Sequence, residues 1–104
     1  MNELKEENLK QYIPQKKYIK NIVSFFYAFS DETRLKIIIA LILKPLCVSE
    51  ISDILDINQT TVSHQLKTLK SLNIVESDRN GKNVIYYIKN NKVEDVLNIC
   101  VECI

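Results

Sequence analysis

The chain has 104 residues, of which 46% are hydrophobic and 26% are charged, and its formal net charge is +1. This composition is typical of a single globular domain and excludes a disordered chain. There is no run of about 18 apolar residues and no secretory signal, so we expect no membrane contact. Three cysteines without an export signal favour a cytoplasmic protein with reduced thiols.

Glycine and histidine are scarce, and this limits the available chemistry. The single glycine excludes glycine-rich phosphate loops. A histidine-dependent triad or metalloenzyme would have to be built around His64 alone. No cysteine lies near His64 in the sequence, so we expect that the protein is not an enzyme.

The first two segments are predicted to be helical. Residues 1–15 form an expected N-terminal extension helix, which Pro14 interrupts. Residues 16–29 carry apolar side chains at helical spacing, namely Ile19, Ile22, Val23, Phe26 and Phe29. Phe25 and Tyr27 lie off that stripe. A helix with apolar residues on more than one side is either deeply buried or in contact with a partner.

Two further helices are expected before residue 56. Ser30 is the predicted N-cap of a helix that runs to about Leu43. This helix is almost entirely apolar after Lys36, as in a central core helix, and Pro45 closes the connection that follows it. A shorter helix over 48–55 is expected to bury its apolar residues, Val48, Ile51, Ile54 and Leu55.

The next helix has two contrasting faces. Asn58 can cap a helix over 59–72, whose inward stripe is Val62, Leu66 and Leu69. Its outward side is polar and carries no acid: Gln59, Thr60, Thr61, Ser63, His64, Lys67, Lys70 and Ser71. The segment 58–89 has a basic excess of about +3, which is consistent with a local nucleic-acid surface.

After residue 72 the spacing of apolar residues changes from a helical period to the period of two that is typical of a strand. One short strand is expected around Ile74 and Val75, and another over 84–88, which is β-branched and aromatic. Asn80-Gly81 between them is a strong hairpin signal, because both turn positions are expected to need positive φ. Helical spacing returns over 92–104, with Val93, Val96, Leu97, Cys100 and Ile104 on one stripe.

This order of elements predicts a mainly α fold with a small β-hairpin. Four helices, the two strands and a last helix make a winged helix-turn-helix, with residues 1–104 forming one domain. Short polar side chains near the start of the helix over 59–72 can contact base edges in the major groove: Gln59, Thr60, Thr61, Ser63 and His64. The expected phosphate contacts are Lys67, Lys70, Arg79 and Lys82.

The same residues resemble a known family. The matching stretches are Phe29-Ser30-Asp31-Glu32-Thr33-Arg34-Leu35-Lys36-Ile37, Cys47-Val48-Ser49-Glu50-Ile51, Gln59-Thr60-Thr61-Val62-Ser63-His64-Gln65-Leu66-Lys67-Thr68-Leu69, Leu72-Asn73-Ile74-Val75 and Arg79-Asn80-Gly81-Lys82-Asn83-Val84-Ile85-Tyr86-Tyr87-Ile88. In this order they resemble the ArsR family of winged-helix repressors. Glu32 stands where the family often has Pro, and Asn73 stands where Gly is usual.

The resemblance implies a homodimer that binds a pseudo-palindromic operator in double-stranded DNA and blocks transcription. It implies dimerisation through the first and last helices, here with 92–104 as the C-terminal dimerisation helix. The apolar surface left over in so small a chain fits this role: Phe25, Tyr27, Val93, Val96, Leu97 and Ile104. The family's inducer is usually a metal ion or a thiol-reactive species, which lowers DNA affinity.

The cysteines are candidate sensing residues. The family's arsenic-type and cadmium-type sites use Cys-Val-Cys where this chain has Cys47-Val48-Ser49, so half of that pair is present. The zinc-type site needs a histidine that the last helix lacks. Cys100 and Cys103, at i and i+3, can chelate a soft ion such as zinc, cadmium or arsenic, with Glu102 and His64 as further possible ligands. Plain packing of the cysteines is the alternative.

Two other interpretations stay open. One is a winged-helix dimer with no inducer site. The other is a protein-interaction module that does not bind DNA, against which the acid-free face over 59–72 argues.

Overall fold

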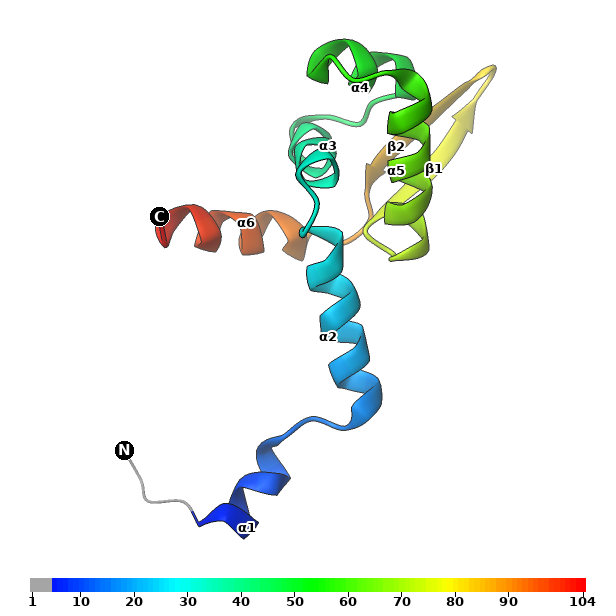
Figure 1. Ribbon diagram of the computed structural model, residues 1–104. Coiled ribbons are helices and arrows are strands. Elements are labelled where there is room, and N and C mark those ends of the chain that lie inside the picture. Colours follow the sequence, from blue (N-terminus) through cyan, green and yellow to red (C-terminus); the bar gives the residue numbers. More distant parts are fainter. Residues whose placement is uncertain (1–4) are drawn as a thin grey trace.

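The computed structural model describes residues 5–104. Over these residues the elements are α1 (Glu6–Leu9), the 3-10 helix η1 (Lys10–Tyr12), α2 (Lys16–Ala28), α3 (Glu32–Leu43), α4 (Val48–Leu55), α5 (Gln59–Ser71), β1 (Val75–Asn80), β2 (Asn83–Ile88) and α6 (Lys92–Glu102). Figure 1 shows a head made of α3, α4, α5 and the hairpin, with α2 leaving it as a stem and α6 projecting on another side. The predicted winged helix-turn-helix is confirmed.

The N-terminal extension is less helical than expected. Within residues 5–13, only the short α1 and η1 form before Pro14. Neither buries a side chain, so packing against the rest of the described chain does not stabilise a longer helix there. Residues 1–4, which the prediction included, lie outside the described residues. Figure 1 places this segment at the end of α2 that is remote from the head.

The N-cap of α3 differs from the prediction, whereas that of α5 agrees with it. Asp31, not Ser30, caps α3, since its carboxylate Oδ2 accepts from the backbone N–H of Arg34 at 3.0 Å. Ser30 instead serves the preceding helix, because its Oγ donates to the carbonyl of Tyr27 at 2.8 Å. Asn58 caps α5 as predicted, with its Oδ1 accepting from the N–H of Thr61 at 2.9 Å.

The core lies where α3 meets α4, α5 and β2. Its largest fully buried side chains are Ile37, Ile38, Ile51, Leu66, Leu69, Ile74, Val62, Val75 and Val93. Only one side of α3 lies in the core, because Ile39 and Leu43, four residues apart on the other side, are 46% and 81% exposed. Ile54, expected in the core, is 61% exposed, and Val93, expected on the dimer surface, is fully buried.

The hairpin forms the wing, with β1 and β2 antiparallel and paired from Val75↔Ile88 to Asn80↔Asn83. The expected Asn-Gly turn is wrong by one residue, because Asn80 belongs to the ladder and the two-residue loop is Gly81-Lys82. Gly81 has φ +65 and takes the first loop position, as in the II′ turns that suit a twisted ribbon. Leu46 also exchanges both backbone hydrogen bonds with Tyr86, at 2.8 and 3.0 Å, which ties the wing to the α3–α4 connection.

The end of α5 is closed by a Schellman motif around Asn73. The N–H of Ile74 donates to the carbonyl of Leu69 at 3.0 Å, and that of Asn73 donates to Lys70 at 3.1 Å. This geometry places Asn73 in the left-handed region, with φ 62. Asparagine tolerates that region, whereas a β-branched residue does not.

Replacing Asn73 by valine is therefore expected to lower the free energy of unfolding by about 1–2 kcal/mol. Asn73→Gly is expected to cause no loss, since glycine adopts positive φ freely. The measurement is the urea midpoint at constant m-value, with Asn91→Val as the matched control at a negative φ. Equal effects of the valine and glycine replacements at Asn73 would contradict the argument.

Candidate nucleic-acid interface

The exposed face of α5 is set by what the helix buries. Val62, Leu66 and Leu69 point into the core and are fully buried. The opposite side is left to solvent, and all seven predicted contact residues of α5 are exposed: Gln59, Thr60, Thr61, Ser63, His64, Lys67 and Lys70. No acid occurs anywhere in α5. The helix can therefore approach a polyanion without like-charge repulsion from its own side chains.

A tight turn presents the start of α5. Asp56 ends α4 in the left-handed conformation, with φ 55, and the N–H of Ile57 donates to the carbonyl of Ser52 at 3.1 Å. Ser52 Oγ donates in turn to the carbonyl of Ile57. These local bonds hold α4 and α5 as one unit, which is the geometry of a helix-turn-helix.

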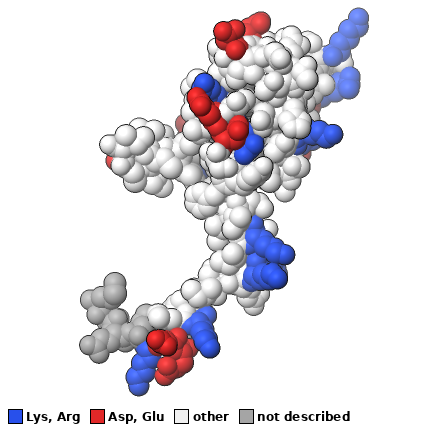
Figure 2. Space-filling model, in the orientation of Figure 1, with Lys and Arg blue, Asp and Glu red and all other residues white. Residues whose placement is uncertain are grey.

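The wing tip lies beside the N-terminus of α5. Lys82 and Asn83 line one hollow with Gln59 and with Cys47 and Ser49 at the start of α4. Arg79 and Lys82 are both exposed on the hairpin. Figure 2 shows basic side chains on the side of the head from which the hairpin projects. The structure thus brings Gln59, a predicted base contact of α5, and Lys82, a predicted phosphate contact of the wing, to one hollow.

Lys70 differs from the other basic residues of this surface. Its Nζ lies 3.4 Å from Glu76 Oε1 and donates to Ser77 Oγ at 2.8 Å, which ties α5 to β1. The N–H of Ser77 and then Lys70 hold the pKa of Glu76 below its usual value. Within residues 5–104, the ion pairs do not involve Lys67 or the two wing residues, Arg79 and Lys82. Those three are therefore the better-placed candidates for phosphate contacts.

The three cysteines occupy two separate places. Cys47 is the N-cap of α4, is partly buried, and has its Sγ 3.2 Å from Ser49 Oγ. Its N–H donates to Glu50 Oε1 at 3.0 Å, and this bond is the main cause of the lowered pKa of Glu50. Cys100 and Cys103 are exposed at the end of α6. Cys100 is therefore not a core residue of the single chain, although it shares a stripe with Val93.

Residues 5–104 of one chain do not complete a metal site. Across the part of the chain that the structure describes, no three His, Cys, Asp or Glu side chains converge well enough to hold an ion. Neither His64 nor Glu102 joins the cysteine pair of α6 in such a cluster. Any metal bound by Cys100 and Cys103 needs further ligands from outside residues 5–104 as they are arranged in the single chain.

Apolar surface remains on α2 and α6. The largest exposed apolar side chains of these helices are Tyr18, Ile19, Ile22, Val23, Phe26, Tyr27, Ile99 and Val101, followed by Ile104 beyond α6. A groove of about 410 Å³ between α3 and α6 is lined by seven apolar residues and Cys100, with Glu94 and Asn98 alongside. Phe25 and Leu97 are partly buried against the core, although Leu97 also lines this groove, and Val96 is partly buried. The surplus of exposed apolar surface is confirmed, but of its six predicted members only Tyr27 and Ile104 are exposed.

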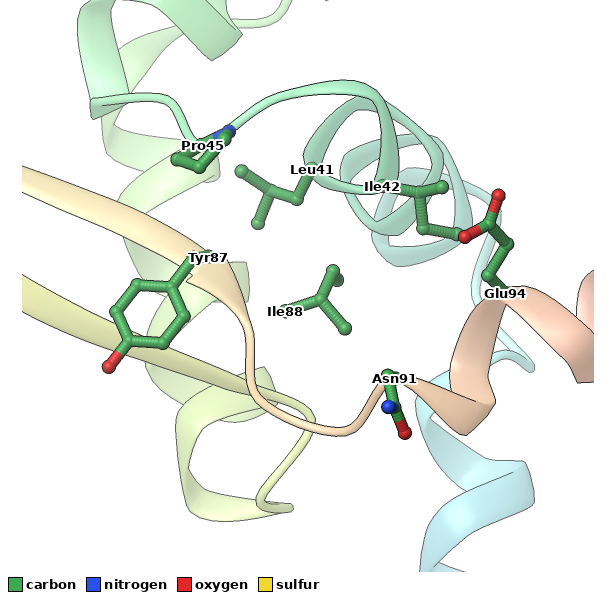
Figure 3. Close-up of a pocket in the computed structure, with 7 residues that line it drawn as sticks. All are labelled: Leu41, Ile42, Pro45, Tyr87, Ile88, Asn91 and Glu94. Atoms are coloured by element: carbon green, nitrogen blue, oxygen red, sulfur yellow. The ribbon is translucent and has the colours of Figure 1, made fainter.

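A second hollow lies where α3, β2 and α6 meet (Figure 3). Leu41, Ile42, Pro45, Tyr87 and Ile88 line it, with Asn91 and Glu94 from the start of α6. It contains none of the predicted site residues.

Arg34 is a buried residue that the sequence analysis did not single out. Its side chain is 6% exposed and donates from Nη2 to the carbonyl of Tyr27 at 2.9 Å and from Nε to that of Ala28 at 3.3 Å. Its Nη1 donates to Gln65 Oε1 on α5, also at 3.3 Å. A signal was available, since Arg34 lies at i−3, i−4 and i−7 from three core residues, Ile37, Ile38 and Leu41.

Comparison with known proteins identifies relatives of this chain. The profile described as "Bacterial regulatory protein, arsR family" matches residues 31–77. The cadmium resistance transcriptional regulatory protein CadC of Listeria innocua is 43% identical over 82 residues, which cover 78% of this chain and 69% of that protein.

Solved structures share the fold. NolR from Sinorhizobium fredii superposes with a TM-score of 0.78 at 20% identity, covering 99% of this chain and 96% of that one. The homodimeric winged helix-turn-helix DNA-binding domain of Mb0332 from Mycobacterium bovis gives 0.77 at 23% identity, covering 99% and 89%. Over residues 5–104 of the present chain, no helix has the length and apolar character needed to cross a membrane.

Proposed function

This chain belongs to the ArsR family of bacterial regulatory proteins, and from this membership we propose that it acts as a homodimeric transcriptional repressor in the cytoplasm and catalyses no reaction. One observation supports the DNA-binding role above all: the exposed, acid-free face of α5 lies beside the basic tip of the wing. Residues 1–104 act as one winged-helix unit, with 92–104 taking part in dimerisation.

The geometry supports two kinds of DNA contact. The first two turns of α5 enter the major groove, where Gln59, Thr60, Thr61, Ser63 and His64 contact base edges. Lys67 and Lys70 on α5, with Arg79 and Lys82 on the wing, neutralise phosphates on either side. Lys70 contributes less than the others, because Glu76 already balances part of its charge.

Dimerisation follows from the apolar surface of α2 and α6. Phe26 of α2 is 59% exposed, and Ile22, Val23 and Tyr27 of the same helix are 47%, 62% and 53% exposed. Covering such a surface with a second copy removes it from water at a gain of about 25 cal/mol per Å². A two-fold dimer presents two copies of α5, so it requires a pseudo-palindromic operator.

The direct test is binding of the purified protein to duplexes enriched from a random library. We expect log K to fall linearly as log salt concentration rises, since phosphate neutralisation releases counterions. Absence of binding at low salt, with the protein folded and dimeric, would favour the protein-interaction module instead.

Lys67→Ala is expected to weaken binding to all duplexes about equally and to reduce the salt slope by about 1. The reason is that Lys67 is an exposed cation on the face of α5 and takes part in no ion pair within the described residues. The matched control is Lys36→Ala, which removes the same charge from α3. If Lys67→Ala changes selectivity but not the slope, the assignment as a phosphate contact is wrong.

The inducer part of the proposal rests on the thiols. The relative from Listeria is named for cadmium resistance, and Cys100 and Cys103 are exposed and three residues apart on one helix. Two such pairs in a dimer supply four thiolates for a soft ion such as zinc, cadmium or arsenic, or two dithiols for an oxidant. The inducer must bind the DNA-free dimer more tightly than the DNA-bound dimer. A dimer without an inducer site is the competing hypothesis.

Titration with Zn(II), Cd(II) and As(III) tests this part. We expect thiolate-to-metal absorption in the ultraviolet together with loss of DNA binding, and we expect Cys100→Ser with Cys103→Ser to abolish both. Cys47→Ser is the matched single-thiol control, because Cys47 caps α4 and does not belong to the cysteine pair of α6. This variant is expected to leave the absorption largely intact. Unchanged regulation in the double serine variant would remove metal and redox sensing by this pair.

A further inference from the structure

The buried cation Arg34 connects three helices through hydrogen bonds. Two of its hydrogen bonds go to the carbonyls of Tyr27 and Ala28 at the end of α2, and the third goes to Gln65 on α5. Its guanidinium carbon also lies 4.6 Å from the ring centroid of Tyr27. Within residues 5–104, neither ion pair includes Arg34. The charge is therefore compensated by carbonyl dipoles at the negative end of α2.

This arrangement depends on a fixed distance between α2 and α5. A guanidinium is a rigid planar fork, so its nitrogens meet acceptors on two helices only when those helices keep one relative position. Moving the end of α2 relative to α5 therefore breaks one of these charge-assisted hydrogen bonds, of which the one to Ala28 is buried and those to Tyr27 and Gln65 are partly buried.

Gln65 lies at a sensitive place on α5. It is partly buried and stands directly between His64, on the exposed face, and Leu66, in the core. Its Oε1 is taken up by Arg34, so the side chain is directed toward α3 rather than left free. The middle of α5, which carries the proposed base contacts, is thus linked through Arg34 of α3 to the end of α2.

We propose that Arg34 and Gln65 form a positioning contact, in which Gln65 supports operator selectivity through Arg34 and α2 rather than by touching a base. This inference rests on the proposed DNA-binding function of α5. Because α2 carries the exposed Phe26 and Tyr27, the same contact joins the proposed dimer surface to the recognition helix. A shift of α2 within the dimer is then transmitted to the base-contacting side chains of α5.

The test compares two replacements of Gln65 in the full chain. Gln65→Met keeps the length of the side chain and removes the acceptor, whereas Gln65→Glu retains an acceptor for Arg34. The readout is the ratio of affinities for a library-enriched duplex and for a scrambled duplex. An added carboxylate weakens both duplexes about equally, so the ratio isolates positioning from charge.

We expect Gln65→Met to lower this ratio about three- to thirtyfold, within the range of coupled contacts, with little change in affinity for the scrambled duplex. Gln65→Glu is expected to keep the ratio near that of the wild type. In an Arg34→Lys background, Gln65→Met is expected to have no further effect. Gln59→Met is the control for a direct base contact, and its effect should persist in both backgrounds.

Three outcomes would overturn the inference. The first is an unchanged ratio in Gln65→Met. The second is a loss of equal size in Gln65→Met and Gln65→Glu, which indicates that Gln65 itself contacts a base. The third is a loss of the same size for Gln65→Met in the wild-type and the Arg34→Lys backgrounds. If the Arg34→Lys chain does not fold, the comparison of methionine with glutamate decides alone. A wild-type protein that binds neither duplex would refute the proposed function instead.

Discussion

Replacement of Arg34 by alanine is expected to lower the free energy of unfolding by about 3 kcal/mol. The change removes three hydrogen bonds at once and leaves the buried carbonyl of Ala28 without its donor. It also opens a space among α2, α3 and α5 that the neighbouring side chains fill only in part. The carbonyl of Tyr27 loses less, because Ser30 Oγ still donates to it.

The measurement is urea unfolding followed by circular dichroism, with the midpoint and the m-value fitted together. Lys36→Ala is the matched control on the same helix, since this exposed lysine has only an i,i+4 pair with Glu32 at 3.3 Å. We expect that control to change stability by less than about 0.5 kcal/mol. A loss below about 1 kcal/mol for Arg34→Ala would show that water or a rearranged side chain replaces the guanidinium.

His64→Ala is expected to weaken binding to the selected operator by about 1–3 kcal/mol, which is roughly five- to 150-fold. Its imidazole is exposed on the second turn of α5, where a helix in the major groove meets base edges. Binding to a scrambled duplex should change little, because that binding depends on phosphates. The salt slope should therefore stay close to that of the wild type.

Competition binding against the enriched duplex and the scrambled duplex measures both effects together. Ser71→Ala is the control, since Ser71 is exposed at the opposite end of α5 and its hydroxyl donates to the carbonyl of Thr68. It is expected to leave both affinities unchanged. Retention of full selectivity by His64→Ala would mean that the base-contacting face of α5 is assigned wrongly.

Much of the fold and of the candidate interface was predictable from local spacing. Val62, Leu66 and Leu69 recur at helical intervals, and burying them directs the other residues of α5 outward whatever surrounds the helix. Asn58 was predictable as a cap because its short side chain reaches the N–H of Thr61 within the same turn. After α5 the spacing of apolar residues changes from a helical to a strand period, and this predicted the wing, because strand spacing also depends only on neighbouring residues.

The wrong predictions concern residues whose positions depend on a second element of the fold. Ser30 is as good a cap as Asp31 by residue type, but its hydroxyl is used by the end of α2. Cys100 shares a stripe with Val93, yet α6 packs against the head through its first half, at Val93 and Leu97, and Cys100 near its end is exposed. The turn of the wing shifted by one residue because the ladder extends to Asn80↔Asn83.

Residue types and their spacing along the chain were enough to predict the order of helices and strands, the face that α5 buries, and the absence of acids on the opposite face. Each of these depends on residues within about one turn or two strand positions of one another. The three-dimensional arrangement was needed to find that Lys82 of the wing lies near Gln59, that Glu76 pairs with Lys70, and that Arg34 reaches Gln65, 31 positions away. Contacts between separate elements depend on how their buried faces pack together, and no periodicity along the chain records that packing.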